Sequence, residues 1–433
     1  MTSPGIPLAT PGADADVYKQ GRLAARLTRV DGGVEFAYEP EYLDDAGPAV
    51  ATTLALSDRP VVTARGAVPP FFAGLLPEGR RLSSLRRAVK TSADDDLSLL
   101  IAVGGDPVGD VQVVPRGQSP IEQRSLVQVE RSFAEITFSD VLEQAGVIDP
   151  VALAGVQDKA SARMLSVPLA QRGRRFILKV DPPEYPHVVL NEAFFIRRAR
   201  AARFPVVDAT IVHDATGRPG LLVSRFDRVI GADGASVSLP VEDAAQVLGL
   251  YPADKYLVSA ESAAGALADL CAARVVAARD LFRQVCFAWL TGNGDVHAKN
   301  LSVLGTLAGE WRVAPAYDLP STLPYGDHTM ALTVGGRSSG LSRRSLLRFA
   351  ADLGVPEPAA ERVMDAVLAA TEGIVDEVAA GAVPSPQRRL RDWTRSLTNR
   401  RLAALCGGGL DDVRGAAPSG GVLHNGSAVQ EGS

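Results

Sequence analysis

The segment from Asp295 to Asn300, which reads Asp-Val-His-Ala-Lys-Asn, constrains this chain more than any other part of its sequence. A kinase catalytic loop places an aspartate five residues before an asparagine. The aspartate accepts the proton of the substrate hydroxyl, and the asparagine binds magnesium. Asp318 follows eighteen residues after Asn300, directly after a strand-like stretch, where a second metal-binding aspartate is expected. Because metal ions neutralise charge on the β- and γ-phosphates, this spacing indicates phosphoryl transfer.

Three upstream features extend the pattern. Lys179 lies at the end of RRFILKV, residues 174–180, a predicted strand in the place where a kinase carries the lysine that pairs with nucleotide phosphates. Glu192 lies in the next predicted helix, residues 191–204, and could pair with Lys179. The turn at 155–159 could cover phosphates through its backbone N–H groups.

Each of these residues also has an ordinary structural explanation. An isolated Asp-x-His-x-Lys-Asn segment is most often a polar turn, and His297 could hydrogen-bond inside a core or share another kind of metal site with Asp295. Lys179 could be a snorkelling lysine at a strand end, and Glu192 a solvated carboxylate at a helix start. The turn at 155–159 matches neither of the common phosphate-binding glycine motifs. Five features in kinase order are much less expected by chance than one, so their order favours phosphoryl transfer.

Composition excludes several other classes of protein. The chain has 433 residues, of which 46% are hydrophobic and 22% charged, so it is globular and long enough for two or three domains. Its net charge of -5 argues against strong nucleic-acid binding by this chain alone. Cys271, Cys286 and Cys406 have no metal-ligand spacing, and the sequence shows neither a secretory leader nor a long apolar run. We expect a reduced, cytoplasmic protein without a membrane segment.

The patterning along the chain predicts several segments. Asp31-Gly32-Gly33 predicts a β-hairpin turn, because Asp-Gly supplies positions with positive φ. The predicted helices of the second half, with apolar residues three and four apart, cover 280–292, 341–354, 358–381 and 387–405. The predicted division is a disordered arm at 1–15, an α/β module at 16–120, a segment like a kinase N-terminal lobe at 121–228, a mainly helical C-terminal kinase domain at 229–405 and a disordered tail at 406–433.

At these residues the chain resembles the HipA family, bacterial serine/threonine kinases that act as toxins of toxin–antitoxin pairs. The resemblance implies an α+β protein with a protein-kinase-like two-lobed fold. Its N-terminal half would be α/β, its C-terminal half all-helical, and the active site would lie between them. The similar motifs follow in family order: FFAGLLPEG at 71–79, GGDPVGDVQ at 104–112, AGVQDK at 154–159, NE at 191–192, RFDR at 225–228, VEDAAQVLG and KY within 241–256, DVHAKN at 295–300 and PAYDLPST at 315–322.

The resemblance also implies roles, with ATP and Mg²⁺ as cofactors. Asp295 would be the catalytic base, Asn300 and Asp318 the magnesium ligands, and Lys179 a contact of the ATP phosphates. The loop at 154–159 would lie over the nucleotide, and residues 224–226 would form the hinge that holds adenine. The implied nucleotide-binding residues are Ala154, Gly155, Val156, Gln157, Asp158, Lys159, Lys179, Glu192, Ser224, Arg225, Phe226, His297, Ala298, Lys299, Asn300 and Asp318.

Two stretches depart from the family pattern. Family members often carry a serine ahead of the phosphate loop, and its autophosphorylation expels the loop and silences the kinase. Ala152 and Ala154 stand in that stretch here, and neither side chain can accept a phosphoryl group. Either Ser161 substitutes or this off-switch is absent. Ser224 occupies a hinge position where glutamate is usual, so adenine recognition there would rely on backbone groups.

The sequence leaves three functions open. The first is a protein kinase toxin that phosphorylates a translation factor, with aminoacyl-tRNA synthetases as the implied substrate class, and so inhibits growth. A small helix-turn-helix HipB-like antitoxin would hold it in check and supply the only link to DNA. The second is a small-molecule phosphotransferase of the aminoglycoside or choline kinase type, disfavoured by the N-terminal module. The third is a catalytically silent antitoxin-binding corepressor, disfavoured because all the base and metal residues are present.

Overall fold

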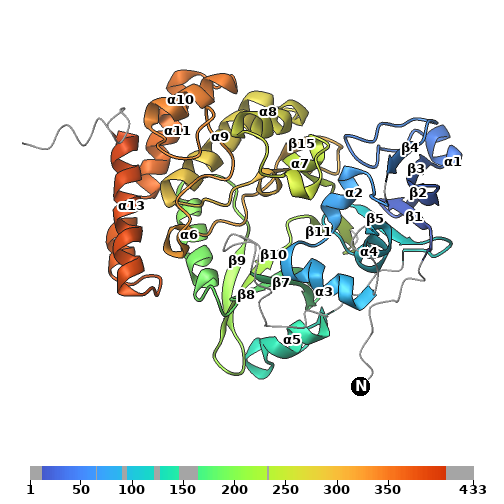
Figure 1. Ribbon diagram of the computed structural model, residues 1–433, viewed down its shortest axis with the longest axis horizontal. Coiled ribbons are helices and arrows are strands. Elements are labelled where there is room, and N and C mark those ends of the chain that lie inside the picture. Colours follow the sequence, from blue (N-terminus) through green and yellow to red (C-terminus); the bar gives the residue numbers. More distant parts are fainter. Residues whose placement is uncertain are drawn as a thin grey trace, which may run out of the picture.

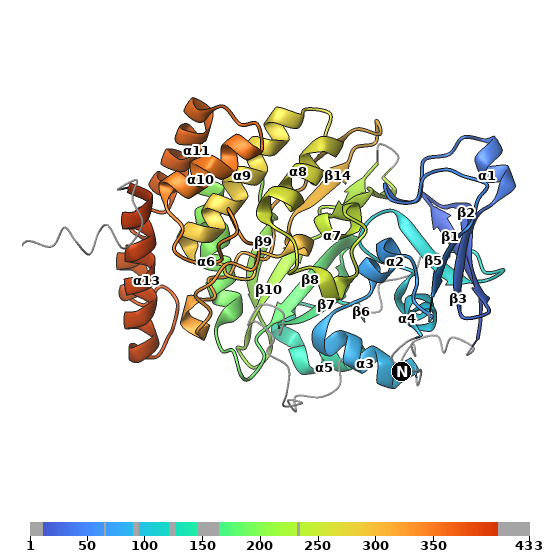
Figure 2. The same ribbon diagram turned by 45° about the horizontal axis from the view of Figure 1, so that its top comes forward.

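The computed structural model describes residues 12–64, 66–89, 95–120, 127–145, 164–231 and 234–405 (Figure 1). The predicted phosphate loop at 154–159, Ala152 and Ser161 ahead of and after it, and the predicted tail at 406–433 lie outside these residues. An N-terminal module, a central sheet and a mainly helical C-terminal half follow one another across the molecule (Figures 1 and 2).

The N-terminal module is built on a five-stranded antiparallel sheet with the order β4-β3-β2-β1-β5. On β3, Val34, Phe36 and Tyr38 alternate inward, and Phe36 packs on Phe72 of a neighbouring helix with ring centroids 5.6 Å apart. The strands are β1 (Ala15–Lys19), β2 (Arg22–Val30), β3 (Gly33–Tyr38), β4 (Val61–Ala64) and β5 (Val111–Pro115), and the helices are α1 (Pro40–Asp44), α2 (Pro70–Leu75), α3 (Gly79–Val89) and α4 (Asp96–Val103).

The start of this module differs in detail from the sequence prediction. The predicted hairpin forms between β2 and β3, but of its turn residues only Gly32 has a positive φ, 77°. A further hairpin joins β1 to β2 through Gln20 and Gly21, both with positive φ. Ala15 begins β1 and is fully buried, so the arm predicted over residues 1–15 ends before it.

The central sheet carries the strand that the lysine pattern predicted. Its five strands have the order β6-β7-β8-β10-β9, and β8 spans Arg174–Val180 as expected. Helix α6 (Val188–Ala201) begins three residues earlier than the predicted 191, because the Asp181 carboxylate accepts the N–H groups of His187 and Val189 and caps it from outside. The other elements here are β6 (Val127–Gln128), β7 (Leu165–Gln171), β9 (Ala209–His213), β10 (Pro219–Ser224), η1 (Phe133–Glu135) and α5 (Phe138–Gln144).

The C-terminal half is mainly helical but not all-helical. The chain beyond β10 also forms a two-stranded hairpin, β11 (Arg228–Ile230) with β12 (Ser236–Ser238), and a three-stranded sheet of β13 (Val241–Asp243), β14 (Ser302–Gly305) and β15 (Trp311–Val313). The helix predicted over 358–381 is interrupted at Gly373, whose φ is 73°. The helical elements are α7 (Ala244–Val247), η3 (Pro252–Asp254), α8 (Ala260–Leu270), α9 (Arg274–Thr291), η4 (Ala298–Asn300), η5 (Leu323–Tyr325), α10 (Arg343–Asp352), α11 (Glu357–Ala370), α12 (Ile374–Ala379) and α13 (Gln387–Leu405).

Helix α9 organises the C-terminal half and ends at the predicted catalytic loop. Its side chains share one hydrophobic core with α6, α10, α11 and α13, and Phe287 and Trp393 lie inside that core. Gly292 ends the helix in the left-handed conformation, with φ 70°. The rigid end of α9 therefore sets where residues 293–300 begin. Among the described residues, no helix is long and apolar enough to cross a membrane.

Substitution of Gly292 tests whether α9 requires a glycine at its end. A Cβ atom at this position would overlap the Leu323 side chain and would impose a left-handed φ on alanine. We expect Gly292→Ala to lower the free energy of unfolding by at least about 1 kcal/mol. Gly265→Ala is the matched control, because Gly265 lies within α8 with open space around it, and it should raise stability by about 0.5–1 kcal/mol. Urea unfolding measures both changes, and equal effects would contradict this account.

Candidate active site

A cavity of about 390 Å³ lies where the central sheet, the C-terminal half and the N-terminal module meet. Its lining comes from β8, from the segment after β10, from the residues around η4 and Asp318, and from the N-terminal module. The central and C-terminal parts contribute Ile177, Lys179, Val223, Ser224, Arg225, Phe226, Lys299, Tyr317 and Asp318, and the N-terminal module contributes Gly74, Glu78, Arg81, Asp106 and Val108. Residues predicted from widely separated motifs thus share one cavity.

Lys179 lies at the centre of this arrangement. On β8 the alternation of side chains buries Leu178 and Val180 in the sheet's other face and turns Lys179 toward the cavity. Its ammonium group lies 2.7 and 3.0 Å from the two carboxylate oxygens of Glu192 on α6, and it also forms an ion pair with Asp318. The side chain of Glu192 is fully buried.

The charges of this cluster depend on one another. Burial alone would lower the pKa of Lys179, but the carboxylates of Asp318 and Glu192 outweigh burial and raise it, so the side chain stays a cation. Burial raises the pKa of Glu192, and Lys179 offsets part of that rise. An ammonium group beside a cavity, with one carboxylate fixed behind it and another at the cavity wall, is suited to a phosphate group accompanied by a metal cation.

The loop after α9 holds Asp318 in place. Asn293 donates from its side chain to the backbone oxygen of Asp318 over 2.8 Å, and its own side-chain oxygen accepts the N–H of Asp295 over 3.1 Å. Asp318 has a φ of 53°, an unusual value for a residue other than glycine. Sequence reasoning missed Asn293, although a polar residue two positions before the aspartate was a visible signal.

Asn300 and Asp318, the predicted magnesium ligands, lie side by side. The Asn300 amide donates to Asp318 Oδ2 over 3.0 Å, and Asn300 Oδ1 accepts the N–H of His297 over 3.1 Å. Both side chains offer hard oxygen atoms, and each oxygen has a second lone pair, so the donor set fits Mg²⁺. The described residues hold no group of three or more His, Cys, Asp or Glu suited to a metal. Mg²⁺ in proteins is commonly bound through one or two side-chain oxygens together with substrate phosphates and waters.

Asp295 is buried, is linked to Asp318 through Asn293, and contacts a residue that was not predicted as part of the site. Its Oδ1 accepts a hydrogen bond from the Tyr256 hydroxyl over 3.3 Å. The Tyr256 ring meets the His297 ring edge to face, with centroids 5.2 Å apart. Ala298, a predicted nucleotide contact, is fully buried and is not among the residues that line the cavity. Tyr256 was present in the KY motif, but spacing alone gave no reason to place it at the aspartate.

Lys299 lines the cavity but is held by other protein groups. Its ammonium group lies 2.9 Å from Asp243 and donates over 2.9 Å to the backbone oxygen of Gly74 in the N-terminal module. Burial alone would lower the pKa of Lys299, but Asp243 and Glu78 outweigh it and raise the pKa. The predicted nucleotide lysine is thus also a link between the catalytic loop and α2.

Tyr317 is a further residue that the predictions missed. Its ring stacks on Phe226 with centroids 5.9 Å apart and an interplanar angle of 27°, and both rings line the cavity. Its hydroxyl donates to the backbone oxygen of Lys299 over 2.6 Å. The pair gives the cavity an aromatic wall next to the predicted hinge.

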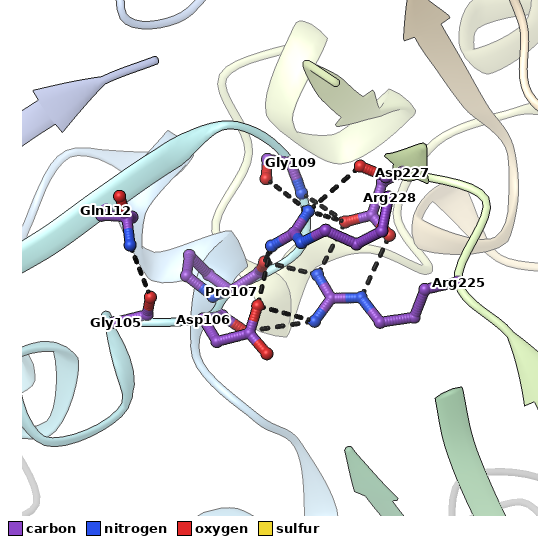
Figure 3. A network of polar contacts seen from close by, with 8 residues as sticks. All are labelled: Gly105, Asp106, Pro107, Gly109, Gln112, Arg225, Asp227 and Arg228. Atoms are coloured by element: carbon purple, nitrogen blue, oxygen red, sulfur yellow. Dashed lines mark hydrogen bonds and ion pairs between the residues drawn. The ribbon is translucent and has the colours of Figure 1, made fainter. Parts of the chain in front are cut away.

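Arg225 of the predicted hinge and nearby Arg228 bind the N-terminal module (Figure 3). Arg225 pairs with Asp227 at 2.7 Å and with Asp106 at 3.0 Å, and Arg228 pairs with Asp106 at 2.8 Å. Burial alone would raise the pKa of Asp227, but the two guanidinium groups outweigh it and hold the pKa below its usual value. The RFDR and GGDPVGDVQ motifs, far apart in the sequence, therefore meet in one network.

The hinge backbone is partly occupied as well. The N–H of Ser224 donates to Asp208 O over 2.8 Å, and the N–H of Arg225 donates to Arg175 O over 3.1 Å. These two N–H groups are therefore already used within the protein and are not available to a nucleobase. The side chain of Ser224 reaches the cavity wall.

Comparison with known proteins places most of the chain in two domains of one family. Residues 15–114 match the HipA N-terminal domain, and residues 151–374 match the HipA-like C-terminal domain. The Sinorhizobium fredii protein Y4mE is 30% identical over 379 residues, which are 80% of this chain and 87% of that protein. The serine/threonine-protein kinase toxin HipA of Shewanella oneidensis is 28% identical over 293 residues, which are 61% of this chain and 65% of that protein.

A solved structure has the same fold. A chain in the Shewanella oneidensis toxin–antitoxin complex of HipA, HipB and operator DNA superposes with a TM-score of 0.71 and 22% identity, covering 93% of this chain and 100% of that chain. The predicted α+β, protein-kinase-like two-lobed fold is therefore confirmed, with the small sheet of the C-terminal half as a refinement.

Removing the buried cation tests the electrostatics of this site. Lys179→Met leaves Glu192 and Asp318 without their counterion, and we expect it to lower the free energy of unfolding by about 3–5 kcal/mol near neutral pH. The folded-state pKa of Glu192 lies above its usual value, so the folded variant gains stability when it binds a proton as the pH falls. The deficit should therefore be smaller at pH 5 than at pH 8 in thermal or urea unfolding.

The matched control adds Glu192→Gln to Lys179→Met. This double variant lacks the buried carboxyl group that takes up the proton, so its deficit should depend much less on pH. An equal deficit at both pH values in the single variant would show that Glu192 does not carry an uncompensated charge.

Proposed function

This chain belongs to the HipA family, and from that premise we propose that it is an ATP-dependent serine/threonine protein kinase that acts as the toxin of a toxin–antitoxin pair. One observation supports the kinase activity above all. Lys179, Glu192, Asn300 and Asp318 come from four separate segments and are joined by ion pairs and hydrogen bonds. Lys179 and Asp318 line the cavity. The four residues are the set of groups that phosphoryl transfer from ATP requires.

Each residue of the site would have a separate role in the proposed reaction. Lys179 would bind and orient the phosphates, with Glu192 keeping its charge in position. Asn300 and Asp318 would hold Mg²⁺, which neutralises the charge on the transferring phosphoryl group. Asp295 would orient the substrate hydroxyl and accept its proton. The aromatic wall of Phe226 and Tyr317 would pack against the adenine ring beside the hinge.

We propose a protein as the phosphoryl acceptor and a HipB-type helix-turn-helix antitoxin as the partner. The antitoxin proposal is supported by the similar Shewanella chain, which is found in a complex of HipA, HipB and operator DNA. A net charge of -5 is consistent with a chain that reaches DNA only through such a partner. Aminoacyl-tRNA synthetases are the substrate class that the family resemblance suggests, and phosphorylation there would inhibit translation and growth in the cytoplasm.

Transfer of label from ATP tests this proposal. The purified chain is incubated with radiolabelled ATP, magnesium and a cell lysate, in parallel with Asp295→Ala. We expect label on a discrete protein band with the native chain, and a rate lower by about 10²–10⁴-fold with the variant, which lacks the positioned base. Asp352→Ala is the matched control, because Asp352 is an exposed aspartate at the end of α10, and it should label at the native rate.

The outcomes separate the alternatives. Mass spectrometry of the labelled band identifies the substrate protein. Label on aminoglycoside or choline and on no protein would indicate a small-molecule phosphotransferase. Magnesium-dependent ATP binding without any transfer would indicate a catalytically silent antitoxin-binding protein. If Asp295→Ala labelled the protein band at the same rate as the native chain, the loop from Asp295 to Asn300 would not be a kinase catalytic loop.

A further inference from the structure

The N-terminal module reaches the cavity at two places. One is the hinge, where Asp106 and the backbone oxygen of Pro107 accept hydrogen bonds from Arg225 and Arg228 (Figure 3). The other is the catalytic loop, approached by the segment between α2 and α3, which runs from the N-terminal module toward the central part of the molecule (Figure 2).

Four alternating charges form the contact at the catalytic loop. Glu78 of the N-terminal module pairs with Lys255, and its Oε1 lies 4.0 Å from the ammonium group of Lys299, which pairs in turn with Asp243 at 2.9 Å. The side chains of the two lysines are only 9% and 14% exposed. Glu78 Oε1 is enclosed and accepts no hydrogen bond from the described residues. Glu78 is therefore the anion of the N-terminal module that faces both enclosed lysines. An enclosed ammonium group without a counterion would lower the free energy of unfolding.

Lys255 links Glu78 to the predicted base. The backbone oxygen of Lys255 accepts the N–H of Ala298 over 3.2 Å, in the middle of the catalytic loop. Its ammonium group lies 5.2 Å from the centroid of the neighbouring Tyr256 ring. The Tyr256 hydroxyl donates to Asp295 over 3.3 Å. A displacement of Lys255 would therefore move both the loop backbone and the group that contacts the Asp295 carboxylate.

We propose that Glu78 is a positioning residue of the kinase reaction, acting through Lys255 to hold Tyr256 and the loop from Asp295 to Asn300 in their reactive arrangement. The N-terminal module is then part of the active site. The proposal rests on the proposed kinase function for its kinetic consequences, but the placement of the loop can be measured without it. It also gives a physical role to the FFAGLLPEG motif at 71–79, which contains Glu78.

Steady-state kinetics with a labelled protein acceptor tests the proposal. Glu78→Gln keeps the shape of the side chain and removes its charge. We expect kcat to fall by about 10–10²-fold, the scale of a small misplacement of reacting groups, with the KM for ATP changed by less than about twofold. Because Glu78 acts through Lys255, adding Glu78→Gln to Lys255→Met should cost less than about a further twofold. If the fold-losses in kcat of the two single variants multiplied in the double variant, Glu78 and Lys255 would act independently and the proposal would be wrong. A change in KM without a change in kcat would also overturn it.

Thr52→Val is the matched control. Thr52 also joins the N-terminal module to the body, through hydrogen bonds of 2.8 and 2.6 Å to Glu242, but it contacts neither Lys255 nor Lys299 in the described structure. It should change kcat and KM by less than about twofold. If Thr52→Val lowered kcat as much as Glu78→Gln does, the effect would belong to docking of the module in general, and Glu78 would have no positioning role.

Hydrogen exchange gives a second readout that does not depend on activity. Amide exchange of residues 293–300 should be faster in Glu78→Gln than in the native chain, and unchanged in Thr52→Val. Faster exchange supports the positioning role even if the native chain transfers no phosphate, in which case only the proposed function fails. Unchanged exchange in this segment overturns the inference whether or not the chain is a kinase.

Discussion

The buried contact of Lys179 with Glu192 and Asp318 is the interaction on which the rest of the structure depends. It joins the central sheet, helix α6 and the segment after β15, three elements far apart in the sequence. Such a cluster adds little net stability, because desolvation of the charges offsets most of their attraction. Its effect is on geometry, since any arrangement that separated the three charges would leave at least one of them buried and uncompensated. The site and the packing of the two lobes are therefore set by the same contact.

Charged side chains bind the N-terminal module to the rest of the protein at two places along the cavity. Asp106 binds Arg225 and Arg228. Glu78 faces Lys255 and Lys299. Both contacts are largely buried, so rigid-body movement of the module would expose or unpair charges at each of them. The cavity of about 390 Å³ then has walls from three parts of the chain, and the module shapes it together with the kinase-like lobes.

Much of the fold could be predicted from the sequence, because local patterns of residues indicate where its strands, turns and helices lie. The strand at 174–180, the β2–β3 hairpin and most long helices follow from apolar periodicity and turn residues. The small sheet of β13, β14 and β15 could not be predicted, since its strands have three or four residues and β13 pairs with β14 across about sixty positions. The predicted start of α6 lies three residues too late, because its cap, Asp181, lies outside the helix. The apolar pattern over 358–381 predicts one continuous helix, although Gly373 interrupts it.

The sequence by itself determined the chemical types in the candidate site and their order, because the proposed reaction requires a base, oxygen ligands and a cation at characteristic spacings. Tertiary structure alone decided which of them touch. It turned Arg225 toward Asp106, paired Lys299 with Asp243, and brought Asn293, Tyr317 and Tyr256 to the site. These contacts join residues whose separation in the chain carries no information about their separation in space. A side chain's partner depends on the packing of whole elements, and no local pattern encodes that packing.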